Sequence, residues 1–237
     1  MDKIKLSLVA ALLAGSTTLS ADFTSDVELS ANVAMTSNYV WRGMTQTGNN
    51  AAIQGGFDAS YEGAYVGIWG SSFEGSKASS EIDLYLGYAN EISGLTYDVN
   101  YCQYTYPGDT DALNFGEASL TLGYDFEVAA VSAKYYVGID TNNVADEAND
   151  GWEPGDGWEL DVSVPLPMDI SLDGTYGEYD DAGTQHSPTN NYGDYYSVSV
   201  SKSFGKFDLS LAYTGMDYEA ADTKDQDSLV ATIGTSF

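Results

Sequence analysis

The chain has 237 residues, and its 36 Asp and Glu against 8 Lys and Arg give a formal net charge of −28. So acidic a chain repels the phosphate backbone, which excludes nucleic acid as a partner. A high acid content also suits disorder, but 19 Tyr, 8 Phe and 4 Trp supply too much aromatic surface for a disordered chain. We therefore expect a folded protein.

The first 21 residues are typical of a secretory signal. Two lysines near the start precede an apolar run over residues 6–15, and residues 19–21, Leu-Ser-Ala, fit a cleavage site. We expect residues 1–21 to be removed on export and residues 22–237 to form one β-barrel domain.

From Val27 to the end, apolar and polar residues alternate with a period of two. This alternation predicts strands with one apolar and one polar face. The segments have lengths that suit tilted staves of a membrane barrel. The predicted strands are residues 27–41, 51–61, 64–73, 80–92, 95–106, 115–126, 129–139, 158–166, 170–179, 194–204, 207–218 and 228–237.

The connections test this assignment. A two-residue turn flips the numerical parity of the outward residues, and the parity flips at residues 62–63, 93–94, 127–128 and 205–206. Parity is kept around Pro167, so that turn should have three residues. These short turns alternate with longer polar connections, as periplasmic turns alternate with outer loops in outer-membrane barrels.

Aromatic residues at the ends of the apolar runs resemble the girdles of membrane barrels. Tyr39 and Trp41 occupy this position in the first strand, and residues 42–50 would then form an outer loop. A soluble β-sandwich also alternates, but the girdles and the alternation of long and short connections favour a barrel. We predict an all-β fold, a transmembrane antiparallel up-and-down β-barrel of about 12 strands.

Two parts of the chain resemble known proteins. The segments NVAMTSNYVWRGMTQTG (residues 32–48), AIQGGFD (52–58) and YVGIWGS (65–71) resemble the TorF-like porin family of Gram-negative bacteria, with Trp41 and Met44 in place of Phe and Ile. Residues 229–237 are similar to the terminal strand, ending in Phe, by which the barrel assembly machinery recognises its clients. The resemblance implies a channel in the outer membrane and supplies no catalytic residues.

The residues predicted to face the lumen are rich in acids. A channel lined with one sign of charge concentrates counter-ions, so we hypothesise passive diffusion of small polar solutes or ions with a preference for cations. The candidate pore-lining residues are Arg42, Glu81, Asp83, Tyr85, Asp98, Tyr104, Glu117, Lys134, Tyr136, Glu159, Asp161 and Asp173.

Purely structural interpretations of these residues stay open. The acids would then only keep the lumen hydrated and pair with Lys134 and with Arg42, which is predicted at the outer rim. The tyrosines either narrow the pore, stack on a solute or fill space. We expect no cofactor and no metal, and the expected partners are outer-membrane lipid, lipopolysaccharide, the assembly machinery and small polar or cationic solutes.

Two other functions remain possible for a barrel. One is a structural or adhesive barrel with a closed lumen. The other is an outer-membrane hydrolase, for which His186 beside Ser187, with Asp180 and Asp181 nearby, is the available candidate. A predicted outer loop is a poor frame for a Ser-His pair, so we expect no catalytic residues.

Overall fold

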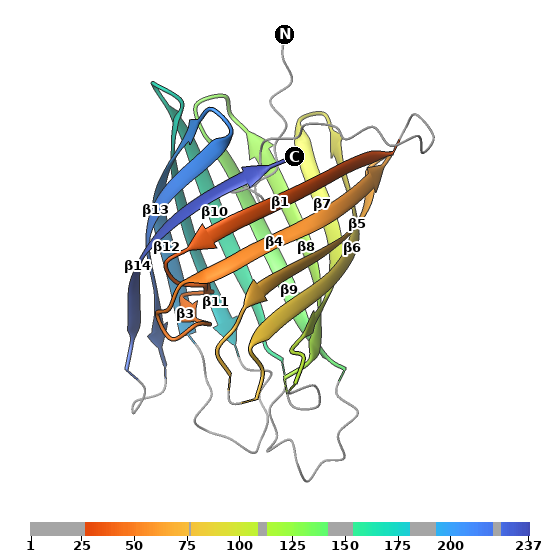
Figure 1. The fold of residues 1–237 in the computed structure, drawn as a ribbon. Coiled ribbons are helices and arrows are strands. Elements are labelled where there is room, and N and C mark those ends of the chain that lie inside the picture. Colours follow the sequence, from red (N-terminus) through yellow and green to blue (C-terminus); the bar gives the residue numbers. More distant parts are fainter. Residues whose placement is uncertain (1–26, 76, 109–112, 142–153, 181–192, 220–223) are drawn as a thin grey trace.

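The computed structural model describes residues 27–75, 77–108, 113–141, 154–180, 193–219 and 224–237. Twelve strands form one closed antiparallel barrel (Figure 1), which confirms the predicted fold class. They are β1 (Glu28–Thr36), β4 (Ala52–Tyr61), β5 (Ala64–Ser72), β6 (Ser80–Ile92), β7 (Leu95–Thr105), β8 (Phe115–Asp125), β9 (Ala130–Asp140), β10 (Asp156–Leu166), β11 (Ile170–Asp180), β12 (Gly193–Phe204), β13 (Phe207–Tyr218) and β14 (Gln226–Ser236).

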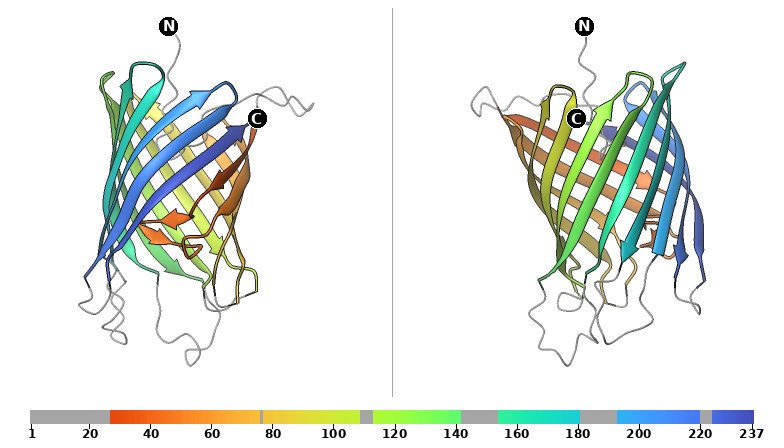
Figure 2. Two further views of the ribbon diagram at one scale, coloured as in Figure 1. Left: turned by 60° about the vertical axis from the view of Figure 1, so that its left-hand side comes forward. Right: turned by 180° about the vertical axis from the view of Figure 1, so that it is seen from behind.

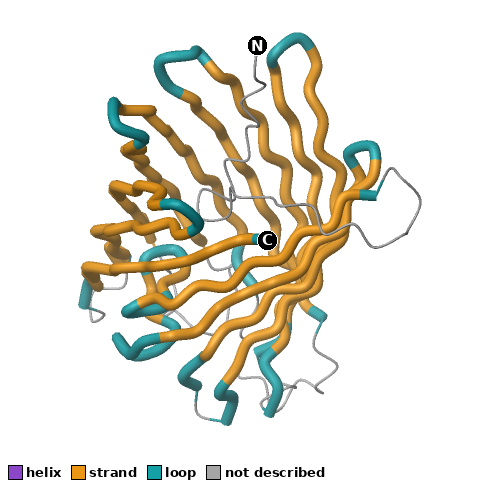
Figure 3. Tube along the Cα trace, turned by 45° about the horizontal axis from the view of Figure 1, so that its top comes forward, coloured by secondary structure: helices purple, strands orange, loops and turns teal. Residues whose placement is uncertain are grey.

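The ring closes where β1 pairs with β14, from Asn32 opposite Ser236 to Thr36 opposite Thr232. Beyond this ladder, Ala31 and the C-terminal Phe237 exchange backbone hydrogen bonds of 3.1 and 2.8 Å. Figure 3, turned so that the end with the short turns comes forward, shows the ring of strands. Closure leaves the sheet without an exposed edge.

The outer surface is apolar, as the alternation predicts. On β4, Ile53 and Phe57 are 61% and 68% exposed, while Ala52 and Gly56, each directly before one of them, are buried. The same alternation follows the other barrel strands, where large apolar side chains are exposed at every second residue. No helix in the described ranges is long and apolar enough to cross a membrane.

The short turns form as predicted and lie at the end of the barrel that carries the C-terminus (Figure 1). Tyr61 pairs with Ala64, Ile92 with Leu95 and Phe204 with Phe207, each across two residues. Phe126 donates its backbone N–H to Ala129, and Leu166 pairs with Ile170 across three residues. The parity of the outward residues therefore predicts the turn lengths correctly.

The first predicted strand, residues 27–41, is too long. β1 ends at Thr36, and the chain then turns into the barrel and forms a separate hairpin of β2 (Val40–Trp41) and β3 (Met44–Thr45). The left view of Figure 2 shows this small hairpin enclosed by the barrel strands. Residues 42–45 are therefore not part of an outer loop. The other eleven predicted strands agree with the structure within two residues at each end.

Some predictions concern residues outside the described ranges. These are the signal segment 1–21 and the histidine His186 with its neighbours Ser187 and Asp181.

The apolar surface predicts how β8 responds to charge. We expect Leu120→Lys to lower the free energy of unfolding in lipid vesicles by about 2 kcal/mol or more, because Leu120 is 45% exposed on the apolar face. The neighbouring Ser119 faces the lumen, so Ser119→Lys should lower the free energy of unfolding by less than about 1 kcal/mol. Urea titration of the reconstituted protein measures both, and equal costs would show that this face does not contact lipid.

Candidate functional site

The hairpin in the lumen turns at Arg42 and Gly43. Both residues have positive φ, 48° and 75°, which is the backbone of a two-residue type I′ turn. Glycine adopts this conformation freely, whereas Arg42 is strained by about 1 kcal/mol. A Cβ on Gly43 would lie 2.0 Å from the carbonyl oxygen of Gly215 in β13, so the tip is pressed against the barrel wall.

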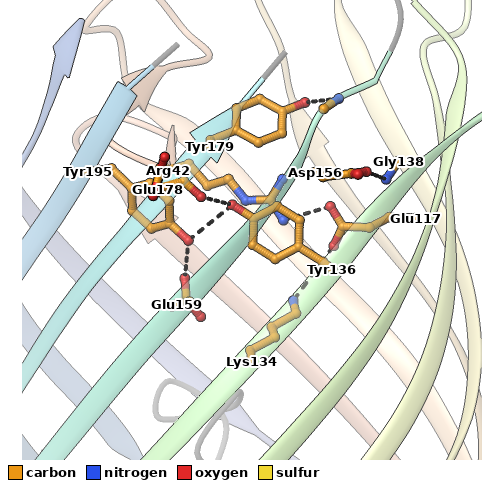
Figure 4. A network of polar contacts seen from close by, with 11 residues as sticks. Arg42, Glu117, Lys134, Tyr136, Gly138, Asp156, Glu159, Glu178, Tyr179 and Tyr195 are labelled. Atoms are coloured by element: carbon orange, nitrogen blue, oxygen red, sulfur yellow. Dashed lines mark hydrogen bonds and ion pairs between the residues drawn. The ribbon is translucent and has the colours of Figure 1, made fainter. Parts of the chain in front are cut away.

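Arg42, the only arginine in the chain, is buried in the lumen (Figure 4). Its Nη2 lies 2.6 Å from Oε2 of Glu117 on β8, and its side chain is only 5% exposed. The Cζ atom lies 3.5 Å from the ring centre of Tyr136 and 4.8 Å from that of Tyr179. Lys134 Nζ is 3.7 Å from the other Glu117 oxygen. Arg42 was predicted at the outer rim. Instead it lies buried inside the barrel, where the carboxylate of Glu117 and the aromatic faces hold it.

Tyr39 and Trp41 were expected in an outer aromatic girdle and instead lie inside. Tyr39 is buried, and its hydroxyl donates to Glu81 Oε1 on β6 at 3.0 Å. Burial, followed by the charge of Glu81, raises the pKa of the Tyr39 phenol well above its ordinary value, so the phenol remains a donor. The Tyr39 ring also meets the edge of Trp69 on β5 at 5.4 Å.

Trp41 extends the contact across the lumen. Its ring centre lies 6.2 Å from those of Tyr104 and Phe115 and 5.2 Å from that of Tyr179 on β11. Met44 packs with Met216 of β13 in the same cluster. The hairpin thus contacts strands on opposite sides of the barrel and crosses the lumen.

The base of the hairpin is held by a polar cluster around Asn38. Its Oδ1 accepts from the Thr45 and Thr47 hydroxyls at 2.7 and 3.0 Å. Its amide nitrogen donates to Ser228 of β14 at 3.3 Å. Gln46 donates its N–H to the Tyr39 carbonyl at 2.7 Å. The hairpin is therefore a compact unit with its own hydrogen bonds.

Three buried polar atoms lack a hydrogen-bond partner among the described residues. They are Nη1 of Arg42, Oε2 of Glu81 and Oδ1 of Asp83. Glu81 and Asp83 are 2% and 6% exposed, and they lie two residues apart on the inward face of β6. Arg42 belongs to the hairpin, Glu81 contacts it through Tyr39, and Asp83 lies beside Glu81 on the wall. Unpaired buried polar atoms are costly, so this contact is not optimised for stability.

The other candidate carboxylates are bound by hydroxyl groups. Asp98 accepts from Tyr65 at 2.7 Å, and Glu159 accepts from Tyr195 at 3.0 Å. The remaining two accept from serine and threonine: Asp161 from Ser132 (3.2 Å) and Thr175 (2.8 Å), and Asp173 from Ser163 (2.6 Å) and Ser171 (2.8 Å). Hydroxyl partners hold these carboxylates in place without cancelling their charge.

Inward tyrosines lie against glycines of the adjacent strand. On β5 and β6, Tyr65 pairs with Gly87 and Gly67 pairs with Tyr85. A Cβ on Gly67 would lie 2.3 Å from the Tyr85 ring, and one on Gly87 would lie 2.4 Å from the Tyr65 ring. Tyr136 and Tyr195 have the same relation to glycines at 157 and 177. These rings cover the sheet, so they narrow the lumen less than tyrosines projecting from it.

The candidate residues fall into several groups. Arg42, Glu117, Lys134 and Tyr136 form one network, and Tyr195 joins it to Glu159. Glu81 and Asp83 lie together on β6, and Asp83 pairs with Tyr104 of β7. Tyr85 donates to Asp58, next to the pair of Tyr65 with Asp98. Asp161 and Asp173 lie apart on the serine-rich side of the barrel.

Sequence reasoning missed the inward role of residues 37–51. The available signal was Ser37, a polar residue at an outward position directly before Asn38. The described residues contain no group of three or more His, Cys, Asp or Glu that could hold a metal ion.

The glycine contacts predict a coupled effect on stability. We expect Gly67→Ala to lower the free energy of unfolding by about 2 kcal/mol, because the new methyl group overlaps the Tyr85 ring. In a Tyr85→Ala background the same change should cost much less. The control Gly174→Ala, where a Cβ meets only Val162 at 3.3 Å and a carbonyl at 4.0 Å, should change stability by less than about 1 kcal/mol. Equal costs of Gly67→Ala in both backgrounds, by urea titration, would contradict the contact.

Comparison with known proteins gives a fold and a family. No curated protein matches the chain in sequence. The solved NanC porin aligns with a TM-score of 0.60 and 10% identity over 88% of this chain and 98% of its own, and the KdgM porin with 0.59 and 7% over the same shares. Identities this low show a shared barrel fold. Residues 20–237 match the family described as "Bacterial protein of unknown function (Gcw_chp)", and the chain belongs to that family.

Proposed function

We propose that the protein is an outer-membrane channel through which small polar solutes and ions diffuse passively, with a preference for cations. The observation that carries this proposal is a closed barrel with an apolar exterior and an acidic, hydroxyl-lined interior. The barrel fold shared with two porins and the resemblance of residues 32–71 to TorF-like porins support it.

The location follows from the same features. An exposed apolar band on every side of a barrel suits lipid rather than water. A secretory signal over residues 1–21 and a C-terminal strand ending in Phe237 fit export and insertion by the assembly machinery.

The preference for cations follows from the balance of charges in the lumen. Both inward cations, Arg42 and Lys134, contact the same carboxylate, Glu117. Asp98, Asp161 and Asp173 accept hydrogen bonds from neutral hydroxyls, which bring no positive charge into the lumen. A low-dielectric wall strengthens the resulting negative potential, which attracts cations and repels anions.

The hairpin limits the size of the solute and also supports a second candidate. A hairpin that contacts opposite walls leaves a narrow passage for small solutes only. If the passage were shut permanently, the protein would be a structural barrel whose outer loops make its contacts. Conductance separates these two functions.

The charge balance predicts selectivity in planar bilayers. We expect discrete conductance steps, and in a KCl gradient a reversal potential displaced toward that of K⁺. Asp161→Asn combined with Asp173→Asn should reduce the ratio of K⁺ to Cl⁻ permeability by about twofold. The control Glu127→Gln, in an exposed turn, should leave the ratio unchanged. Absence of steps would favour the structural barrel, and a displacement toward Cl⁻ would contradict the preference for cations.

A further inference from the structure

We propose that the β2–β3 hairpin, together with its flanking residues 37–39 and 46–51, is a releasable plug, and that Arg42 is the positioning residue that holds it in the lumen. Release would uncover acidic residues of the wall, so the open state would be both more conductive and more cation-selective than the closed state. This inference rests on the proposed channel function.

Two features of the structure destabilise the plugged position of the hairpin. Two of the three buried polar atoms without partners, on Arg42 and Glu81, belong to residues that join the hairpin to the wall, and the third is on Asp83, two residues from Glu81 on the inward face of β6. Water would satisfy each of them once the hairpin moved away. Arg42 also has a strained backbone, with a φ of 48°. Strain and unpaired polar atoms at one contact lower the energy gap to a second arrangement.

Specific contacts oppose these costs. Arg42 pairs with Glu117 at 2.6 Å and lies over the Tyr136 ring, and Tyr39 donates to Glu81. The packing of Met44 and Trp41 against wall aromatics also favours the plugged position. Few of these contacts are backbone ladder bonds to the barrel, so their loss leaves the barrel intact.

The hairpin is built to move as a unit. Its strands pair with each other, and the Asn38 cluster with Thr45 and Thr47 ties its base together. These internal bonds do not depend on Glu117 or Glu81. The base remains linked to β14, where Ser37 donates its N–H to the Ala231 carbonyl and Asn38 donates to Ser228, and this link provides a fixed point for the movement. Release would break two further bonds to the barrel, from the Thr45 N–H to Gln226 and from the Glu74 N–H to the Gln46 carbonyl.

Release changes the charge of the lumen as well as its width. In the plugged state Glu117 is neutralised by Arg42, and Glu81 is covered by Tyr39. In the released state both carboxylates and Asp83 face the passage, and the only arginine has left it. Conductance and cation selectivity should therefore increase together.

Single-channel recording tests the latch. We expect the wild-type protein to switch between two conductance levels, with the upper level more selective for K⁺ over Cl⁻. Arg42→Gln should raise the ratio of time spent in the upper level on the order of tenfold or more, because it breaks a buried ion pair. Arg42→Lys, which keeps the charge, should have a smaller effect. The control Lys202→Gln removes one positive charge far from the hairpin and should change nothing.

A covalent latch makes the test reversible. In a Cys102→Ser background, Arg42→Cys and Glu117→Cys can be joined by a short bifunctional methanethiosulfonate reagent. Its two disulfides should hold the channel in the lower level until dithiothreitol reduces them. A single level that neither Arg42→Gln nor the cross-link alters would overturn the plug while leaving the channel function standing.

Thiol labelling tests the plug without relying on conduction. Ser71 is buried and pairs with Glu81, the residue that Tyr39 contacts. Ser71→Cys, in the Cys102→Ser background, should react with a charged thiol reagent faster when Arg42→Gln is added, by about tenfold or more. The control Ser201→Cys, on the inward face of β12 near the short turns, should react at the same rate in both cases.

The two measurements separate the two proposals. Faster labelling of Ser71→Cys without any conductance steps would support the plug and overturn the channel function. Unchanged labelling together with conductance steps would do the reverse.

Discussion

Closure of the sheet between β1 and β14 is the constraint on which the structure depends. A membrane-sized sheet with an open edge would expose unpaired backbone groups, and the ladder from Asn32–Ser236 to Thr36–Thr232 removes that edge. Once the ring is closed, alternate residues must point into a common interior. The polar half of each strand is thereby collected around one lumen, and any segment that enters it must find polar partners there.

The hairpin meets this requirement only in part. Burying the only arginine calls for an anion, and Glu117 supplies it from the opposite wall at 2.6 Å. Tyr39 similarly gives Glu81 one hydrogen bond. The turn that aims Arg42 at Glu117 needs positive φ at a residue that does not favour it. The fit between hairpin and wall is therefore specific but strained, unlike the regular ladders around it.

The barrel was predictable because its determinants are local, whereas the plug was not. Period-two alternation and turn parity depend on neighbours in sequence, so they predicted even the three-residue turn between Leu166 and Ile170. Tyr39 and Trp41 continue the outward apolar positions of the first strand, and only Ser37 and the apolar Val40 depart from the alternation there. The partner of Arg42 is 75 residues away, and the match of Tyr85 with Gly67 depends on strand register. Such contacts follow from the closed ring and are invisible before it is built.

The position of Arg42 changes what an acidic lumen means. In a barrel whose charges are all fixed to its strands, selectivity is a constant of the fold. Here the acids lie on the wall, while the main counter-charge lies on a hairpin with its own hydrogen bonds. Lys134 stays on β9 and can offset only part of the wall charge, at 3.7 Å from Glu117. In the proposed channel, the net charge that a solute meets therefore depends on the position of the hairpin, which ties the width of the passage to its selectivity through a single side chain.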